Sequence, residues 1–226
     1  MLAIALGVRA RLLLARGAND EAHQAAERGI ELMKQAGTPR DLIALDLEQT
    51  LAAVGLARGE ADAELARLRL AVPAEQPPGV TLFAPQVGMR LLAGEAALRS
   101  GDGAGAATQF AAVWADLQAN GEAELHGEWL AAAALGLGRA HRLNREHAKA
   151  LPELQSAERL LAHWHAAGSL DLAEARLALA EGLLDLNDKP AARALWARAQ
   201  QAIASQGRVA ARYREALQAV QARLAG

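Results

Sequence analysis

The chain has 226 residues and a formal net charge of −2 at pH 7, so no strong overall charge attracts nucleic acid or anionic lipid. It contains no cysteine, which excludes disulfides, thiol chemistry and cysteine-ligated metals. Alanine, the best helix former, makes up about a quarter of the residues, and aromatic residues only 3%. Because β-branched residues are also sparse, we expect an all-α chain.

The N-terminal residues 1–8 are apolar, like the core of a signal peptide, but Arg9, Arg11 and Arg16 interrupt this pattern and no cleavage site follows. No apolar run approaches the ~18 residues of a membrane span. We therefore expect a cytoplasmic chain with neither a membrane nor a nucleic acid as partner. The first helix begins almost at Met1 without a capping residue, and we expect further protein upstream.

A short turn recurs along the chain and closes on a small residue. It occupies residues 15–22, 57–64, 99–106, 143–150 and 185–192, and the closing positions 22, 64, 106, 150 and 192 are 42, 42, 44 and 42 residues apart. A fixed period in this range indicates an array of structural repeats.

Each repeat is predicted to contain two helices joined by this turn, in units of about 1–37, 38–80, 81–121, 122–168 and 169–207. Glycine and asparagine tolerate the left-handed conformation that closes a helix. The first helices are predicted to end at Gly17, Gly59, Gly101, Asn144 and Asn187. The second helices are predicted to end near Gly37, Pro77-Pro78-Gly79, Gly121, Gly168 and Gly207.

Helix starts are marked by Thr38 in the second unit and by Ser169 in the fifth, both good N-caps. Residues 72–81 are predicted to form an extended loop inside one continuous solenoid of residues 1–226, because the period carries across them. A final helix over 208–224 has one apolar face, including Tyr213 and Val220, and one charged face. Such a helix is expected to cap the last repeat.

The small and large apolar positions recur in a fixed order within the repeats. They are Ala93-Gly94, Ala106, Phe110 and Val113; Leu137-Gly138, Ala150, Leu154 and Ala157; and Leu179-Ala180, Ala192, Trp196 and Ala199. This order resembles the tetratricopeptide repeat (TPR) family, in its long-helix variant as in bacterial regulators and at the C-termini of eukaryote-like Ser/Thr kinases. Glu64 departs from the pattern. The resemblance implies a right-handed α-α superhelix of about five hairpins plus a C-terminal capping helix.

In that family the first helices of the hairpins line a concave groove. By resemblance, the groove-facing residues are Arg11, Gln49, Glu95, Arg99, Arg139, Arg142, Glu181 and Asp185. Arg99, Arg139 and Arg142 are predicted to form a basic patch that binds a carboxylate or phosphate. The alternative is that these charges pair with one another or remain solvated.

No pattern for catalysis, a cofactor or a metal emerges. Gly101-Asp102-Gly103-Ala104-Gly105 lacks the strand and the Gly-Lys-Ser/Thr ending of a phosphate loop and is predicted to be a turn. No histidine pair has ligand spacing beside an acid.

The favoured function is a non-enzymatic scaffold that binds a peptide or protein segment, with an acidic one as the candidate, within a larger bacterial signalling or regulatory protein. The alternatives are a sensor of a small anionic ligand and, third, an enzyme with an unrecognised pocket. The sequence specifies neither the partner nor the oligomeric state.

Overall fold

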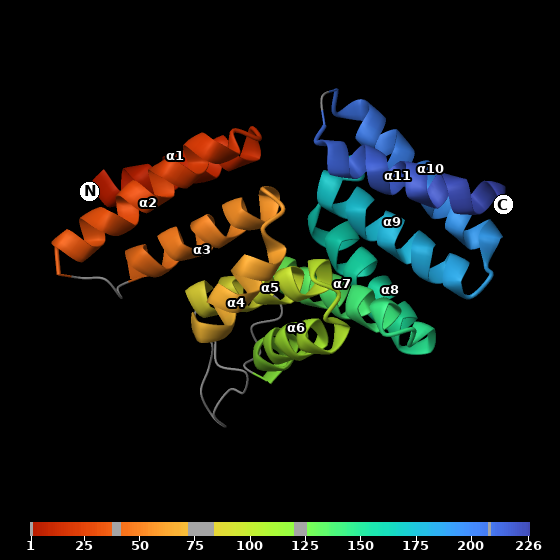
Figure 1. Ribbon diagram of the computed structural model, residues 1–226. Helices are drawn as coiled ribbons and strands as arrows, with labels where there is room; N and C mark the ends of the chain where they lie inside the picture. The colour runs from red at the N-terminus through yellow and green to blue at the C-terminus, as the bar shows by residue number, and fades with distance from the viewer. Residues whose placement is uncertain (1, 38–41, 72–83, 120–125, 208) are drawn as a thin grey trace. The chain divides into compact units, whose positions relative to one another are not determined.

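A computed structural model describes residues 2–37, 42–71, 84–119, 126–207 and 209–226. These residues form eleven α-helices and no strand, in agreement with the all-α prediction. Within the described ranges, no helix combines the length and the apolar character that a bilayer crossing requires. The helices are α1 (Leu2–Ala15), α2 (Asn19–Gln35), α3 (Leu42–Ala57), α4 (Ala61–Ala71), α5 (Ala84–Arg99), α6 (Gly103–Ala119), α7 (Gly127–Leu143), α8 (His147–Trp164), α9 (Leu170–Asp185), α10 (Lys189–Ser205) and α11 (Ala211–Ala225) (Figure 1).

The chain divides into two compact units, Met1–Asp102 and Gly103–Gly226. In the first unit, α1 and α2 form a hairpin that packs on α3, and α5 packs against α3 and α4. In the second unit, α6 packs against α7, and the hairpins α7/α8 and α9/α10 pack on each other. The predicted hairpin of residues 81–121 corresponds to α5 and α6, which belong to different units, and the single continuous solenoid remains a prediction.

Five turns between first and second helices share one geometry. The residue five positions before the closing small residue is left-handed in each: Gly17, Gly59, Gly101, Arg145 and Asn187. The next residue then donates its backbone N–H to the carbonyl five positions earlier, as Glu146 does to His141 at 2.8 Å and Asp188 to Leu183 at 2.9 Å. This is the hydrogen bond of a Schellman helix end. The glycine-rich stretch at 101–105 therefore begins with such a turn, as predicted.

Two predicted helix ends are wrong in detail. In the 143–150 turn the left-handed residue is Arg145, with a φ of 61°, and not Asn144. Helix α8 ends at Trp164, and its C-cap His165 is extended, so Gly168 does not close that helix. The predicted N-cap at Ser169 is confirmed, since its side chain accepts a hydrogen bond from the Leu172 N–H at 3.2 Å.

In the hairpins α1/α2, α7/α8 and α9/α10, the closing small residue lies where the two helices approach each other. Ala22, Ala150 and Ala192, which close these hairpins, are fully buried, and Ala106 of α6 is fully buried as well. Glu64 takes this position in the second hairpin, and Gly55 of α3 makes room for it. A Cβ atom added to Gly55 would lie 2.4 Å from Glu64 Oε1, closer than side chains allow. The exception at position 64 is thus compensated by a glycine across the helix contact.

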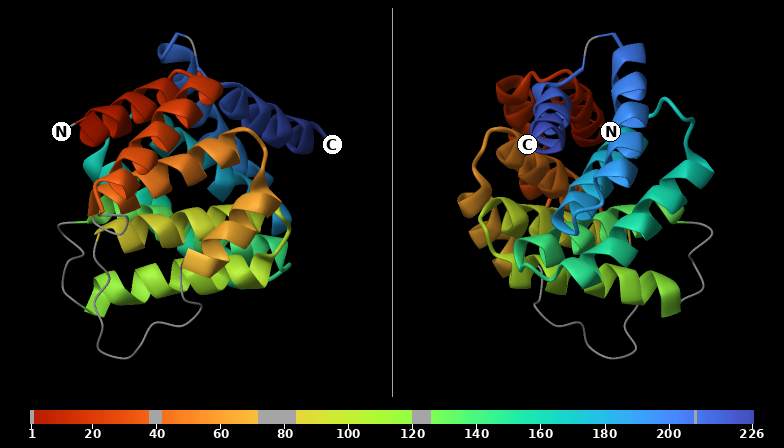
Figure 2. Two further views of the ribbon diagram at one scale, coloured as in Figure 1. Left: turned by 60° about the vertical axis from the view of Figure 1, so that its left-hand side comes forward. Right: turned by 90° about the vertical axis from the view of Figure 1, so that its right-hand side faces the viewer.

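Helix α11 lies alongside α9 and α10 at the end of the second unit, as Figure 1 shows and Figure 2 repeats in dark blue. Tyr213 and Val220 are buried against the apolar residues of α9 and α10. The indole N–H of Trp196 on α10 donates to the carbonyl of Leu217 at 3.0 Å. Helix α11 therefore closes the last hairpin as a cap, starting at Ala211 instead of 208.

Several predictions lie outside the described residues. These are the extended loop at 72–81, the N-cap at Thr38, and the helix ends at Pro77-Pro78-Gly79 and Gly121.

Candidate functional site

All eight residues predicted to face the groove lie on first helices of the repeats. Helix α1 carries Arg11, α3 carries Gln49, α5 carries Glu95 and Arg99, α7 carries Arg139 and Arg142, and α9 carries Glu181 and Asp185. First helices of successive repeats lie side by side within a unit, as α1 and α3 or α7 and α9 do. Polar side chains on these helices can therefore reach across to the next repeat.

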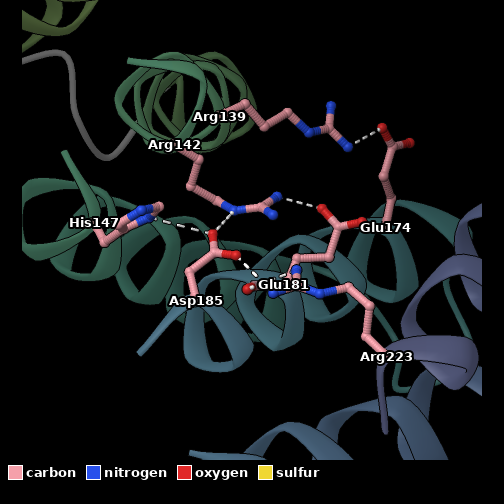
Figure 3. A network of polar contacts seen from close by, with 7 residues as sticks. All are labelled: Arg139, Arg142, His147, Glu174, Glu181, Asp185 and Arg223. Carbon is pink, nitrogen blue, oxygen red and sulfur yellow. Dashed lines mark hydrogen bonds and ion pairs between the residues drawn. The ribbon is translucent and has the colours of Figure 1, made fainter. Parts of the chain in front are cut away.

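In the second unit, four of these side chains take part in polar contacts along α7 and α9, drawn in Figure 3. Asp185 is at the centre of these contacts: Oδ2 accepts from Arg142 Nε at 2.6 Å, and Oδ1 accepts from Arg223 Nη2 at 2.8 Å. Arg142 Nη1 also donates to Glu181, one helical turn earlier on α9. His147 at the start of α8 places Nδ1 3.4 Å from Asp185 Oδ2. One carboxylate of α9 is thus hydrogen-bonded to both α7 and α11, with the start of α8 close by.

A second contact lies further along the same two helices. Arg139 Nη2 donates to Glu174 Oε1 at 2.7 Å. Glu174, Glu181 and Asp185 are seven and four residues apart, so the helical period places them on one face of α9, opposite the arginines of α7. We call these seven residues the charged row: Arg139, Arg142, His147, Glu174, Glu181, Asp185 and Arg223.

The arginine contacts decide the charge state at the centre of the row. Burial by itself would raise the pKa of Asp185, but hydrogen bonds from Arg142 and Arg223 and their positive charges outweigh it and lower that pKa. Burial would lower the pKa of Arg142, but the hydrogen bond to Asp185 and the charges of Glu181 and Asp185 raise it. Both groups are therefore ionised at neutral pH.

The first unit carries simpler contacts. Arg11 Nη1 donates to Asp46 Oδ1 at 2.6 Å, from α1 to α3. Arg99 donates from Nε to Glu95 Oε1 at 2.8 Å, within α5, and from Nη1 to the Leu56 carbonyl of α3 at 2.7 Å. Gln49 lies against Gly88 of α5, where an added Cβ would be 2.3 Å from Gln49 Nε2.

The structure thus brings together four of the predicted residues, Arg139, Arg142, Glu181 and Asp185. Arg99 belongs to the first unit, so the convergence of Arg99, Arg139 and Arg142 on one patch remains a prediction. Sequence reasoning did not select Asp46, His147, Glu174 and Arg223.

Two of these residues, Asp46 and Glu174, could have been found from their distance to the closing small residues of the repeats. Arg11 and Arg139 each stand 11 residues before a closing small residue, Ala22 and Ala150. Asp46 and Glu174 each stand 18 residues before the next closing position, at 64 and 192. The contacts Arg11–Asp46 and Arg139–Glu174 are therefore the same contact in two repeats, both spanning 35 residues.

The described residues contain no cluster of three His, Cys, Asp or Glu side chains that could hold a metal ion. The row is built from matched cations and carboxylates on helix surfaces, which suits recognition of charged groups by hydrogen bonds.

Comparisons with known proteins identify the fold. No family model and no curated protein matches the sequence. Two crystal structures of near-identical TPR-like repeats, assigned to a kinesin light chain of Podosopora anserina, are similar to the chain, and one of them carries a single substitution. They have TM-scores of 0.60 and 0.62 and 16% identity, and cover 91% of this chain and 96% of theirs. This likeness concerns the fold alone, and the chain therefore has the fold of TPR-like helical repeats.

Proposed function

We propose that this chain is a protein-interaction scaffold that binds a peptide or protein segment in the concave groove lined by its first helices. TPR-like repeats in general serve as non-catalytic scaffolds, since stacked repeats create extended binding surfaces. The scaffold would act in the cytoplasm as part of a larger bacterial signalling or regulatory protein. The support for a bacterial source is compositional: lysine is scarce beside arginine, and alanine is abundant.

The charged row is the observation that supports a binding role for the first helices. Its arginine and carboxylate side chains lie on α7, α9 and α11, and solvent still reaches them: the side chain of Arg139 is 30% exposed and that of Arg223 41%. A guanidinium carries five N–H donors. Among the described residues, Arg142 meets Glu181 and Asp185 through Nη1 and Nε. An incoming carboxylate can add to such arginines without displacing Asp185.

The ligand that suits this arrangement is an acidic peptide or a free C-terminal carboxylate. Arginine binds a carboxylate through two parallel hydrogen bonds, which gives both affinity and orientation. The row also offers carboxylates of its own, so basic residues of the same segment can pair with Glu174 or Glu181. Because the row is partly solvated, binding should weaken as salt screens it within about 8–10 Å.

The test uses a fluorescein-labelled acidic peptide with a free C-terminus and the whole chain, followed by fluorescence anisotropy. Arg139→Gln in the second unit and Arg99→Gln in the first are made separately. Each change removes a charge-assisted hydrogen bond of ~1.5–3 kcal/mol, so each should weaken binding about tenfold or more if the peptide contacts that unit. Arg142 is a poorer choice, because its loss would leave Glu181 and Asp185 facing each other.

Arg198→Gln is the matched control, since Arg198 is an exposed arginine on α10, a second helix. Binding that Arg198→Gln weakens as much as Arg139→Gln does would show general charge attraction and not a groove site. Competition by free acetate or phosphate at low concentration would instead favour the small-anion sensor.

A further inference from the structure

Helix α1 exposes a group of large apolar side chains and carries none of the residues of the charged row. Leu2, Ile4, Val8 and Leu12 are 62%, 45%, 44% and 56% exposed. Ile4, Val8 and Leu12 follow one another at four-residue spacing and so form one stripe along the helix. The opposite face of α1 is covered, because α2 and α3 both pack against it (Figure 1). We call the exposed stripe, with Leu2, the α1 outer face.

Residues at the same distance from the closing small residue in the later repeats show how exposed these positions are elsewhere in the chain. Leu12 stands ten residues before its closing small residue, and every equivalent residue in the later repeats is buried: Val54, Ala96, Ala140 and Gly182. The equivalents of Leu2 are Ala44, Leu130 and Leu172, which are at most 2% exposed, and the half-buried Gln86. Thus α1 exposes Leu2 and Leu12 at positions that the later repeats bury or half-bury, whereas Ile4 stands at the position of Asp46 and Glu174, which stay partly exposed.

The contacts at those equivalent positions identify the kind of element that covers them. A Cβ atom on Gly136 of α7 would lie 2.4 Å from the ring of Phe110, which belongs to the preceding helix α6. A Cβ atom on Gly182 of α9 would lie 2.8 Å from Leu154 Cδ1 on the preceding helix α8. In each case the second helix of the preceding hairpin inserts a large side chain over a glycine of the first helix. The covering element is therefore an α-helix.

On α1 large side chains stand where α7 and α9 have glycine, and this difference indicates which side chains a covering helix needs. Val8 and Leu12 stand where α7 and α9 have Gly136 and Gly182, so a covering helix must offer small residues and receive the large ones. Helix α2 already offers such a residue to α3: its Gly29 is buried and receives Leu47 of α3.

The charges beside the α1 outer face indicate which charge a partner helix should carry. Helix α1 has no acidic residue, and Arg9 and Arg16 are exposed beside the α1 outer face. A second copy placed α1 to α1 would bring arginines of both copies together, which disfavours self-association through this face. A helix with acidic flanks complements it. Helix α2 again has the right chemistry, because Asp20, Glu21, Glu27 and Glu31 are exposed around its small residues.

We propose that the α1 outer face is a docking site for an amphipathic α-helix of a partner protein, with an alanine- and glycine-rich ridge and acidic flanks. The partner helix extends the stack of helices by one, covering α1 as α2 covers α3. This site is independent of the peptide-binding role of the charged row, because its contact surface is apolar.

The probe is a synthetic peptide with the sequence of residues 19–35, held helical by a hydrocarbon staple that replaces the exposed residues Gln24 and Arg28 and so keeps every acidic residue, and labelled with fluorescein. Its binding to the whole chain is measured by anisotropy, beside a scrambled peptide of the same composition. The parent chain should bind the probe and not the scrambled peptide. Leu12→Gln should weaken binding about tenfold, since one leucine no longer gains burial. Arg9→Glu should weaken it further.

Leu143→Gln is the matched control, since Leu143 is an exposed leucine on α7 that lies outside the α1 outer face. It should leave the probe affinity unchanged. Because Leu12 is exposed, Leu12→Gln should also keep the parent melting temperature. The proposal is overturned if the parent chain does not distinguish the probe from the scrambled peptide. It is equally overturned if sedimentation shows the parent to be a dimer that Leu12→Gln converts to a monomer, because the occupant would then be a second copy.

Discussion

Each unit contains the same polar contact at equivalent repeat positions, and the second unit contains a further one. Arg11–Asp46 in the first unit and Arg139–Glu174 in the second occupy the same repeat positions. The first is a pair in solvent, with side chains 50% and 43% exposed. In the second unit Arg142 and Asp185, at 18% and 12% exposure, add a further contact that also reaches α11 through Arg223.

The difference has a local cause in the sequence. Arg142 and Asp185 take the repeat positions that Leu14 and Ala57 occupy in the first unit. Leu14 and Ala57 can make no ion pair, so α1 and α3 depend on packing at that level. An exposed pair contributes about 0–1 kcal/mol, whereas a partly buried and shared one contributes more because water competes less. The comparison teaches that one repeat geometry can hold helices together with or without charge.

The largest expected effect comes from removing α11, which only the second unit possesses. Truncation after Gly207 uncovers the apolar surface around Leu195 and Trp196 and removes Arg223 from Asp185. With Tyr213 and Val220 lost from the core, the second unit should lose about 3–6 kcal/mol of stability and associate with itself. Hydrogen exchange should show faster opening of α9 and α10, with α1 to α3 unchanged.

Sedimentation and thermal melting of the truncated chain test this prediction. A truncated chain that stays monomeric and melts like the parent would show that α11 is a tail and not a cap. It would also show that the contacts of α11 add no stability to the second unit.

A smaller effect is expected at the hairpin contact of the second unit. Ala150 is fully buried, so Ala150→Leu should overpack the approach of α7 and α8 and cost about 1–3 kcal/mol. Ala148→Leu is the control, because Ala148 lies exposed on the same helix. Denaturant unfolding should place Ala148→Leu within about 0.5 kcal/mol of the parent. Equal stabilities of the two variants would contradict the contact assigned to Ala150.

The smallest expected effects come from removing the carboxylates of the two polar contacts, Asp185 in the second unit and Asp46 in the first. Asp185→Asn should cost about 1–2 kcal/mol at neutral pH, because Arg142 and Arg223 lose their shared charged acceptor. Asp46→Asn should cost about 0–1 kcal/mol, as expected for an exposed pair. Urea unfolding of both variants beside the parent measures the difference. Similar costs would mean that the charged row adds nothing beyond its separate pairs.

The pH dependence of the Asp185 effect has a definite sign. The pKa of Asp185 is lowered in the folded chain. Its contribution is therefore fully present above the unfolded value of about 3.9 and is lost as pH falls through the lower folded value. The gap between parent and Asp185→Asn should hold from pH 7 to about pH 5 and narrow below about pH 4. A gap that stays constant down to pH 3 would contradict the ionised pair.

The local features of this fold could be predicted from the sequence, because short-range chemistry decides them. Gly17, Gly59 and Gly101 mark turns since glycine adopts positive φ without strain. Ala150 and its equivalents mark close helix contacts because only small side chains permit them. The assignment of Asn144 failed by one residue. Its neighbour Arg145 holds the required place, five residues before Ala150, and the backbone geometry of the turn prevailed over residue preference.

Only the tertiary structure decided how the charges pair and which surfaces remain open. Arg142 has Glu181 and Asp185 as partners because α7 and α9 lie side by side at one particular register, and a shift of one helical turn would change both partners. Arg223 reaches Asp185 from a helix that the sequence marks only as amphipathic. Leu12 and Val54 look alike as apolar residues in their helices, yet Leu12 is 56% exposed and Val54 is fully buried. Burial and ion pairing depend on neighbours about 40 residues away, and composition and local periodicity contain no such distance.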